Sequence, residues 1–114
     1  MRSTRLVIAT LAVAGGLASA LPALAGTATL KGFVGPGFSI GTSSKTVAAG
    51  TVKLVVSDKA AIHSFHVRGP GVNVKTSIAG IGTKTFTIKL KKGATYRFFC
   101  DLHPDKLHGS FKAT

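Results

Sequence analysis

Short runs of alternating apolar and polar residues, separated by glycine-rich turns, are the feature that most constrains how this chain folds. The clearest run is Thr85–Leu90, in which Phe86, Ile88 and Leu90 alternate with threonine and lysine. Successive side chains of a strand point to opposite faces, so a period of two is typical of a strand with one buried face. No segment after residue 26 keeps a helical period. The pattern therefore predicts an all-β domain.

Further segments of similar composition lie between turn signals along the chain. We expect strands at Thr27–Val34, Thr51–Val56, Ile62–Arg68, Ala94–Cys100 and Gly109–Ala113. The glycine-rich stretch Gly35–Gly41 is expected to be a loop or a bulged connection. Regular short strands with frequent turns predict a β-sandwich or a small barrel.

The first 25 residues have the composition of an export signal. Arg2 and Arg5 precede an apolar run that begins at Leu6, and the small-residue pattern Ala23-Leu24-Ala25 follows that run. A basic start, an apolar middle and an A-x-A ending are typical of a secretory signal peptide. We therefore expect residues 1–25 to be a signal peptide.

Cleavage after Ala25 would leave residues 26–114 as one domain, in the periplasm or outside the cell. The alternative is an uncleaved membrane anchor, because Leu6–Ala25 is just long enough to span a bilayer. The glycines and Pro22 in that segment favour the signal peptide. We expect no stable membrane insertion once the segment is removed.

Composition excludes several classes of function. The chain has 15 basic residues against 3 acidic ones and a net charge of +12, which falls to +10 if cleavage removes Arg2 and Arg5. Such a charge can indicate nucleic-acid binding, but export and lysines spread along the chain do not favour it. An acidic protein partner or an anionic envelope surface is the better expectation. The chain has three aspartates and no glutamate, so it offers few residues for catalysis by a pair of carboxylates, as in glycoside hydrolysis. The single cysteine excludes an intramolecular disulfide.

One group of residues carries metal-ligand chemistry. Cys100 and His103 form a C-x-x-H motif, and His63 lies far upstream in another expected strand. One thiolate and two imidazoles are the donor set of a trigonal copper site. Zinc or an empty site is the alternative, although structural zinc normally takes four protein ligands. A buried free cysteine is usually a core residue, but Asp101 and Pro104 place this one beside a loop.

These residues and their neighbours resemble the cupredoxin family, which includes plastocyanin and azurin. Ile62-His63-Ser64-Phe65 resembles the His-Asn or His-Ser motif of the family, and Tyr96-Arg97-Phe98-Phe99-Cys100-Asp101-Leu102-His103 resembles its C-terminal ligand segment. Tyr96 also resembles the tyrosine at a strand corner of the family. The resemblance covers most of the segment from Gly50 to Phe111. It implies a Greek-key β-sandwich that holds one type 1 copper ion, cycling between Cu(I) and Cu(II).

The resemblance assigns His63, Cys100 and His103 as the three strong metal ligands. His66 is the alternative to His63 for the first position. The two are three residues apart and would face opposite sides of an extended strand. Ser64, or its backbone N–H, is expected to hydrogen-bond the sulfur or to brace the loop.

The fourth, axial position departs from the family pattern. The methionine that family members place there corresponds to Leu107, which has no donor atom, and the only methionine of the chain is Met1. Loss of the weak axial ligand favours Cu(I) and predicts a raised reduction potential. His108 is the competing axial candidate.

The implied function is electron transfer by a monomer. We do not expect an enzyme, since nucleophilic catalysis by Cys100 with a histidine would need an Asn or Asp to orient the histidine, and none can be placed there. We expect a redox protein partner with an acidic docking surface. The expected contact patch around His103 is formed by Leu102, Pro104, Leu107 and Pro70. The alternatives are a copper-handling protein that passes the ion on, and a structural β-sandwich without metal.

Overall fold

The structure is a computed structural model that describes residues 27–114, so the expected signal peptide over residues 1–25 lies outside the described residues. Within the described part no helix is long and apolar enough to cross a membrane. The described chain forms nine strands: β1 (Ala28–Val34), β2 (Ile40–Thr42), β3 (Thr46–Val47), β4 (Gly50–Asp58), β5 (His66–Gly69), β6 (Val72–Lys75), β7 (Gly82–Leu90), β8 (Thr95–Phe99) and β9 (His108–Ala113).

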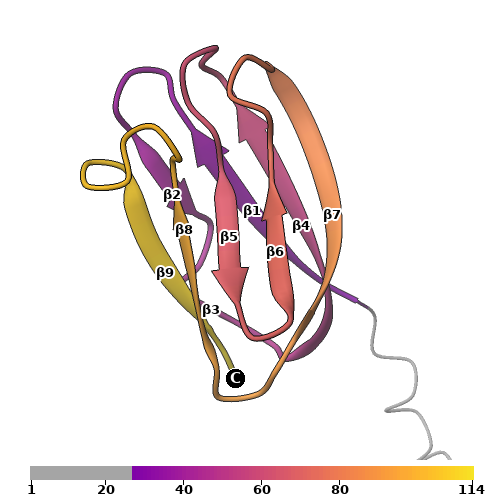
Figure 1. Ribbon diagram of the computed structural model, residues 1–114. Coiled ribbons are helices and arrows are strands. Elements are labelled where there is room, and N and C mark those ends of the chain that lie inside the picture. The colour runs from indigo at the N-terminus through magenta and orange to yellow at the C-terminus, as the bar shows by residue number, and fades with distance from the viewer. Residues whose placement is uncertain (1–26) are drawn as a thin grey trace, which may run out of the picture.

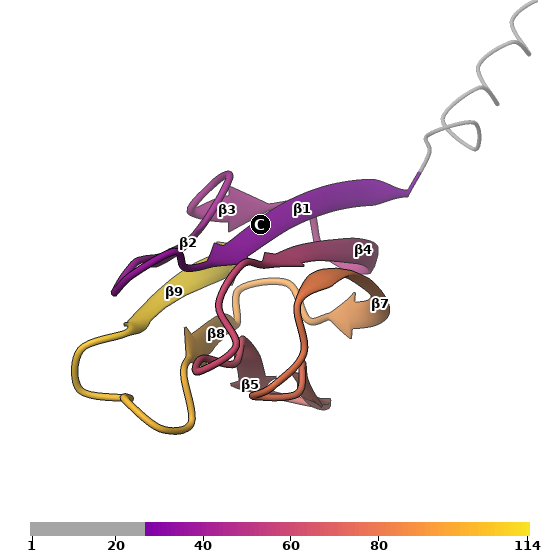
Figure 2. The same cartoon turned by 90° about the horizontal axis from the view of Figure 1, so that it is seen from above.

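The strands form two sheets that pack face to face (Figures 1 and 2). One sheet has the order β2-β1-β4-β7 and the other the order β3-β9-β8-β5-β6. Parallel pairing joins β1 to β4 and β3 to β9, and the other neighbours are antiparallel. The chain crosses repeatedly between the sheets, and the expected all-β sandwich is confirmed.

The core lies between the sheets and is built from alternating inward-facing side chains. On β4, Val52, Leu54 and Val56 are fully buried, while the residues between them face outward. On β8, Tyr96 and Phe98 are buried in the same way. Burying aliphatic and aromatic side chains on one face of each sheet is the main favourable term that holds such a sandwich together.

The strand expected at Ile62–Arg68 is shorter than expected, because β5 begins only at His66. Backbone donors that a strand would use for pairing are taken by side chains instead. The Ser64 N–H donates to Cys100 Sγ and the Phe65 N–H donates to Thr76 Oγ1, at 3.4 and 2.9 Å. His63 therefore lies in the loop between β4 and β5, not on a strand.

Three short strands do not follow from the sequence pattern. β2 and β3 have three and two residues, and β2 takes Ile40 and Gly41 from the stretch expected to be a loop. β6 has four residues and pairs with β5 after a tight turn, where Gly71 has a φ of 72°. Runs this short contain too few residues for a period of two to be recognised.

Loops from distant parts of the sequence meet at one end of the sandwich. The connections at 35–39, 59–65 and 100–107 lie together at the upper end in Figure 1, and the β5–β6 and β7–β8 turns lie at the other end. At that lower end the Tyr96 hydroxyl accepts a hydrogen bond from the Lys91 N–H and donates one to the Pro70 carbonyl, at 2.8 and 3.2 Å. The two turns are thus tied together away from the upper loops.

Candidate metal centre

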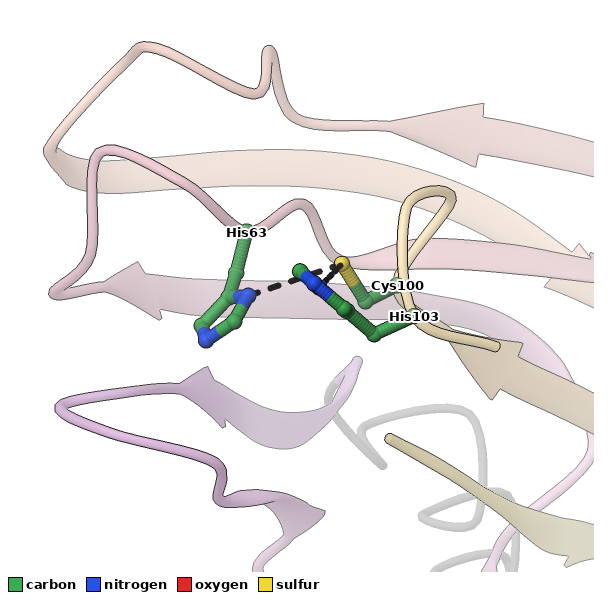
Figure 3. A group of neighbouring side chains, drawn as sticks. All are labelled: His63, Cys100 and His103. Carbon is green, nitrogen blue, oxygen red and sulfur yellow. Dashed lines mark hydrogen bonds between the residues drawn. The ribbon is translucent and has the colours of Figure 1, made fainter. Parts of the chain in front are cut away.

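Three donor residues converge at the upper end of the sandwich. His63 comes from the β4–β5 loop, Cys100 directly follows β8, and His103 lies in the loop that leads to β9. Their ligand atoms all lie within 4.8 Å of one another (Figure 3). His63 and Cys100 are fully buried, and His103 is half-buried. The predicted donor set is therefore brought together by the fold.

The separations of the donor atoms fit binding to one metal ion. Cys100 Sγ lies 3.7 Å from His63 Nδ1 and 4.0 Å from His103 Nδ1. Metal–sulfur and metal–imidazole bonds are about 2.3 and 2.0–2.1 Å long at zinc sites. If the same lengths hold here, a trigonal ion would place its sulfur and nitrogen ligands about 3.8 Å apart. The two observed sulfur–nitrogen separations lie on either side of this value.

The ring of His63 is oriented by a contact on its far side. His63 Nε2 lies 2.9 Å from the Gly37 carbonyl oxygen, so this nitrogen is the one that donates. The proton on Nε2 leaves the lone pair of Nδ1 directed toward Cys100. Metal-binding histidines are commonly oriented by such a hydrogen bond from the second ring nitrogen. Gly37 lies in the stretch for which the sequence indicated only a loop.

Cys100 is held by hydrogen bonds to both of the loops that surround it, one through its sulfur and one through its backbone. The Ser64 N–H donates to Sγ at 3.4 Å, as expected from the sequence. The Cys100 N–H donates to the Leu107 carbonyl at 3.0 Å, and the Leu107 N–H donates to the His103 carbonyl at 2.9 Å. The segment from Cys100 to Leu107 therefore closes on itself, which fixes the distance between the thiol and His103.

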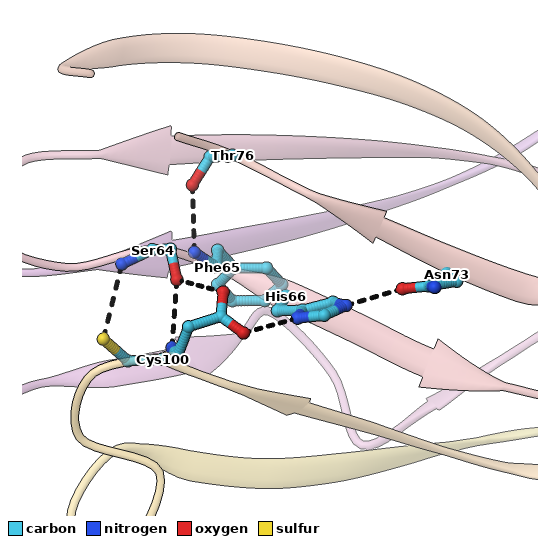
Figure 4. Close-up of polar contacts among 7 residues, drawn as sticks. Ser64, Phe65, His66, Asn73, Thr76 and Cys100 are labelled. Carbon is cyan, nitrogen blue, oxygen red and sulfur yellow. Dashed lines mark hydrogen bonds and ion pairs between the residues drawn. The ribbon is translucent and has the colours of Figure 1, made fainter. Parts of the chain in front are cut away.

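A polar network braces the two loops beside the sulfur (Figure 4). The Ser64 hydroxyl donates to Asp101 Oδ2 at 2.8 Å, and the Asp101 N–H donates back to Ser64 Oγ at 3.0 Å. Asp101 Oδ1 lies 2.8 Å from His66 Nδ1, and the other nitrogen of His66 lies 2.6 Å from Asn73 Oδ1. The network connects the loop at residue 64 to β5 and β6.

Burial and hydrogen bonding act in opposite directions on the Asp101 carboxyl group. Desolvation by burial raises its pKa, but the hydrogen bonds from His66 and Ser64, together with the charges of His66 and Lys75, outweigh it. The pKa of Asp101 is therefore lowered from its ordinary value of 3.8.

The alternative ligands lie outside the donor cluster. His66 is occupied by Asp101 and Asn73, as described above. His108 is exposed and its Nδ1 lies 2.9 Å from the Pro104 carbonyl oxygen. Leu107 is buried, with 1% of its surface exposed, and it belongs to the hydrophobic core. Its expected place in a surface contact patch is therefore wrong. The expected place of Pro70 in that patch is also wrong, because Pro70 lies in the β5–β6 turn at the other end of the sandwich.

Sequence reasoning missed the aromatic residue that covers the cluster. Phe38 packs on the rings of both His63 and His103, with ring centroids 5.1 Å apart in each case, and its own side chain is 61% exposed. A lone aromatic residue in a glycine-rich loop carries no periodic signal. Its position becomes visible only when the loop is placed against the two histidines.

The comparisons with known proteins agree with this architecture. Rusticyanin, a copper protein, superimposes with a TM-score of 0.59 at 20% sequence identity, over 77% of this chain and 78% of that chain. Reduced rusticyanin superimposes with a TM-score of 0.56 at 23% identity, over 77% and 79%. Reduced auracyanin from the photosynthetic bacterium Roseiflexus castenholzii gives 0.55 at 18% identity, over 79% and 98%. No family model and no curated protein sequence matches this chain. At these identities the likeness establishes a shared fold.

Replacing Asp101 by asparagine tests the network through its pH dependence. A carboxylate with a lowered pKa in the folded state stabilises the protein fully above the ordinary value of 3.8, and this contribution is lost as the pH falls through the lowered value. We expect Asp101→Asn to reduce the free energy of unfolding of the metal-free protein by about 1–2 kcal/mol near neutral pH. Urea unfolding across the acid range measures the difference, which should shrink below pH 3.8. A difference that does not change with pH would contradict the role of this carboxylate.

Proposed function

The chain has the cupredoxin fold, and we propose that it is an exported type 1 copper protein that carries electrons between redox partners. The observation that carries this proposal is the convergence of Cys100 with His63 and His103 at one end of the sandwich. Copper held there would supply a one-electron couple between Cu(I) and Cu(II).

The donor set favours copper over zinc. A soft thiolate suits Cu(I), and imidazole accepts both oxidation states of copper. Structural zinc usually takes four protein ligands, and the cluster within the described residues offers three. The N–H of Ser64 directed at the sulfur would stabilise negative charge on the thiolate and tune the potential further.

Leu107 is proposed to stand at the axial position without binding the ion. Its backbone contacts with Cys100 and His103 tie it to the loop that holds two of the donors, and its side chain has no donor atom. His108 is the weaker axial candidate because its Nδ1 is engaged by a backbone carbonyl in an exposed position.

Burial of the cluster favours an electron carrier over a copper-handling protein. A protein that passes copper on needs donors that an accepting protein can reach, and Cys100 and His63 have no exposed surface. Electrons need only an accessible edge, which the half-buried ring of His103 provides. Phe38, Ile62 and Leu102 are exposed apolar side chains of the loops at this end, and an apolar contact area suits a weak, transient encounter.

The remaining parts of the proposal follow from charge and from the N-terminal segment. The net charge of +12, which falls to +10 once Arg2 and Arg5 are removed, would attract an acidic partner. The expected signal peptide would place the domain outside the cytoplasm, where it acts as a monomer.

Voltammetry of the copper-loaded protein tests electron transfer directly. We expect a reversible one-electron wave, because the buried cluster should hold the ion in both oxidation states with little rearrangement. Cys100→Ser is the control and should lose the wave, while His108→Ala should retain it. No wave from the folded, copper-loaded parent protein would overturn the carrier function.

The axial assignment predicts the direction of a shift in potential. Leu107→Met introduces a weak sulfur donor that favours Cu(II), so the reduction potential should fall below that of the parent protein. Both this change and Leu107→Ile conserve volume and should cost less than about 1.5 kcal/mol of stability. Leu107→Ile offers no donor and should leave the potential close to the parent value. Equal shifts in both variants, or a rise in Leu107→Met, would place another residue at the axial position.

A further inference from the structure

Two arginines lie directly opposite each other on the outer face of the five-stranded sheet. The register pairs Arg68 of β5 with Arg97 of β8, and both side chains are exposed. The same row continues to Asn73 on β6 and to Ser110 on β9. These strands form the layer nearest the viewer in Figure 1. The row therefore presents hydrogen-bond donors across four strands.

The arginine pair is costly for the isolated protein. Like charges directly opposite each other on neighbouring strands destabilise a sheet. The three carboxylates of the chain lie elsewhere: Asp58 is buried, Asp101 is bonded to Ser64 and His66, and Asp105 lies in the loop after His103. Within residues 27–114 the only ion pair is the one between His66 and Asp101. Neither arginine is neutralised by the described chain.

The row also borders a depression in the surface. Arg68, Asn73, Thr95 and Arg97 are among the residues that line an open hollow of about 600 Å³. A guanidinium group presents a planar fork of N–H donors that matches a carboxylate with two parallel hydrogen bonds. Two such forks beside amide and hydroxyl groups form a surface suited to oxyanions.

We propose that this face, defined by Arg68, Asn73, Thr95 and Arg97, docks an acidic partner protein through the carboxylates of that partner. The proposal deepens the function proposed above, on which it rests, by adding a charged docking face on the sheet to the apolar contact area around His103. Arg97 lies on β8, three residues before Cys100. A partner bound at the docking face therefore lies against the strand that leads to the sulfur.

The absence of large exposed apolar side chains from β5, β6 and β8 favours a protein over a lipid surface. Basic surfaces that bind membranes usually also insert large apolar side chains between the lipids. The large exposed apolar residues of the described chain are Phe33, Phe38, Ile62, Ile81 and Leu102. None of them lies on β5, β6 or β8. The docking face therefore carries no large apolar side chain that is fully exposed.

Titration with a hexaglutamate peptide, followed by the backbone amide NMR signals of the metal-free protein, tests this inference. We expect shifts concentrated on β5, β6 and β8, and binding that weakens as salt is added. The double variant Arg68→Gln/Arg97→Gln should weaken binding by about tenfold or more, since it removes two charge-assisted contacts. Because it also removes the like-charge pair, this variant should be at least as stable as the parent at low salt.

The matched control removes the same charge from the other sheet. Lys31 and Lys53 are exposed on β1 and β4, and neither faces another cation directly across the β1–β4 pair. Lys31→Gln/Lys53→Gln should weaken peptide binding by less than about threefold if binding is local. Equal losses in both double variants, or shifts centred elsewhere, would overturn the docking face.

Vesicles distinguish the lipid alternative. Binding to phosphatidylglycerol vesicles that depends on Arg68 and Arg97, without binding to hexaglutamate, would replace a protein partner by a membrane and overturn the proposal. None of these measurements uses copper, so their failure leaves the voltammetric test of the proposed function intact.

Discussion

The contact between two loops at Ser64 and Cys100 is the interaction on which the candidate metal centre depends. The Ser64 N–H reaches the sulfur, and its hydroxyl exchanges hydrogen bonds with Asp101 on the other loop. Without that bridge, the position of His63 relative to the thiol would depend on the strands behind its loop and on its contacts with Gly37 and Phe38. Bracing of this kind lets a metal site be formed before the metal arrives, and it keeps the donors in place when the charge of the ion changes.

The rigid core and the donor-bearing loops occupy different parts of the sandwich. The sandwich buries a continuous apolar core, and the Tyr96 hydroxyl joins two turns at the end remote from the donor cluster. The cluster lies at the opposite end, where loops from three parts of the chain meet. Loops can carry donors at exact positions only if the strands that lead into them are fixed. Here β8 ends at Phe99, one residue before Cys100.

Local sequence patterns predicted the long strands and the donor set, and tertiary contacts decided the rest. The alternation at Thr85–Leu90 gives β7, and C-x-x-H with an upstream histidine gives the cluster. The predicted start of β5 at Ile62 was wrong, because the backbone N–H groups of Ser64 and Phe65 donate to side chains and not to a neighbouring strand. The contacts of Gly37 and Phe38 with the histidines could not be predicted, because both residues come from a loop whose path depends on the folded sandwich. The pairing of Arg68 with Arg97 likewise depends on register between strands far apart in sequence.

The visible absorption of the protein loaded with Cu(II) tests the central claim most directly. A thiolate bound to copper together with two imidazoles gives intense charge-transfer absorption, because electron density moves from sulfur to the ion. The account predicts a strongly coloured protein with one copper per chain, which loses its colour in Cys100→Ala and keeps it in His66→Ala. Copper bound by the folded parent protein with only pale absorption, as expected for nitrogen and oxygen ligands alone, would contradict the assignment of Cys100 with His63 and His103.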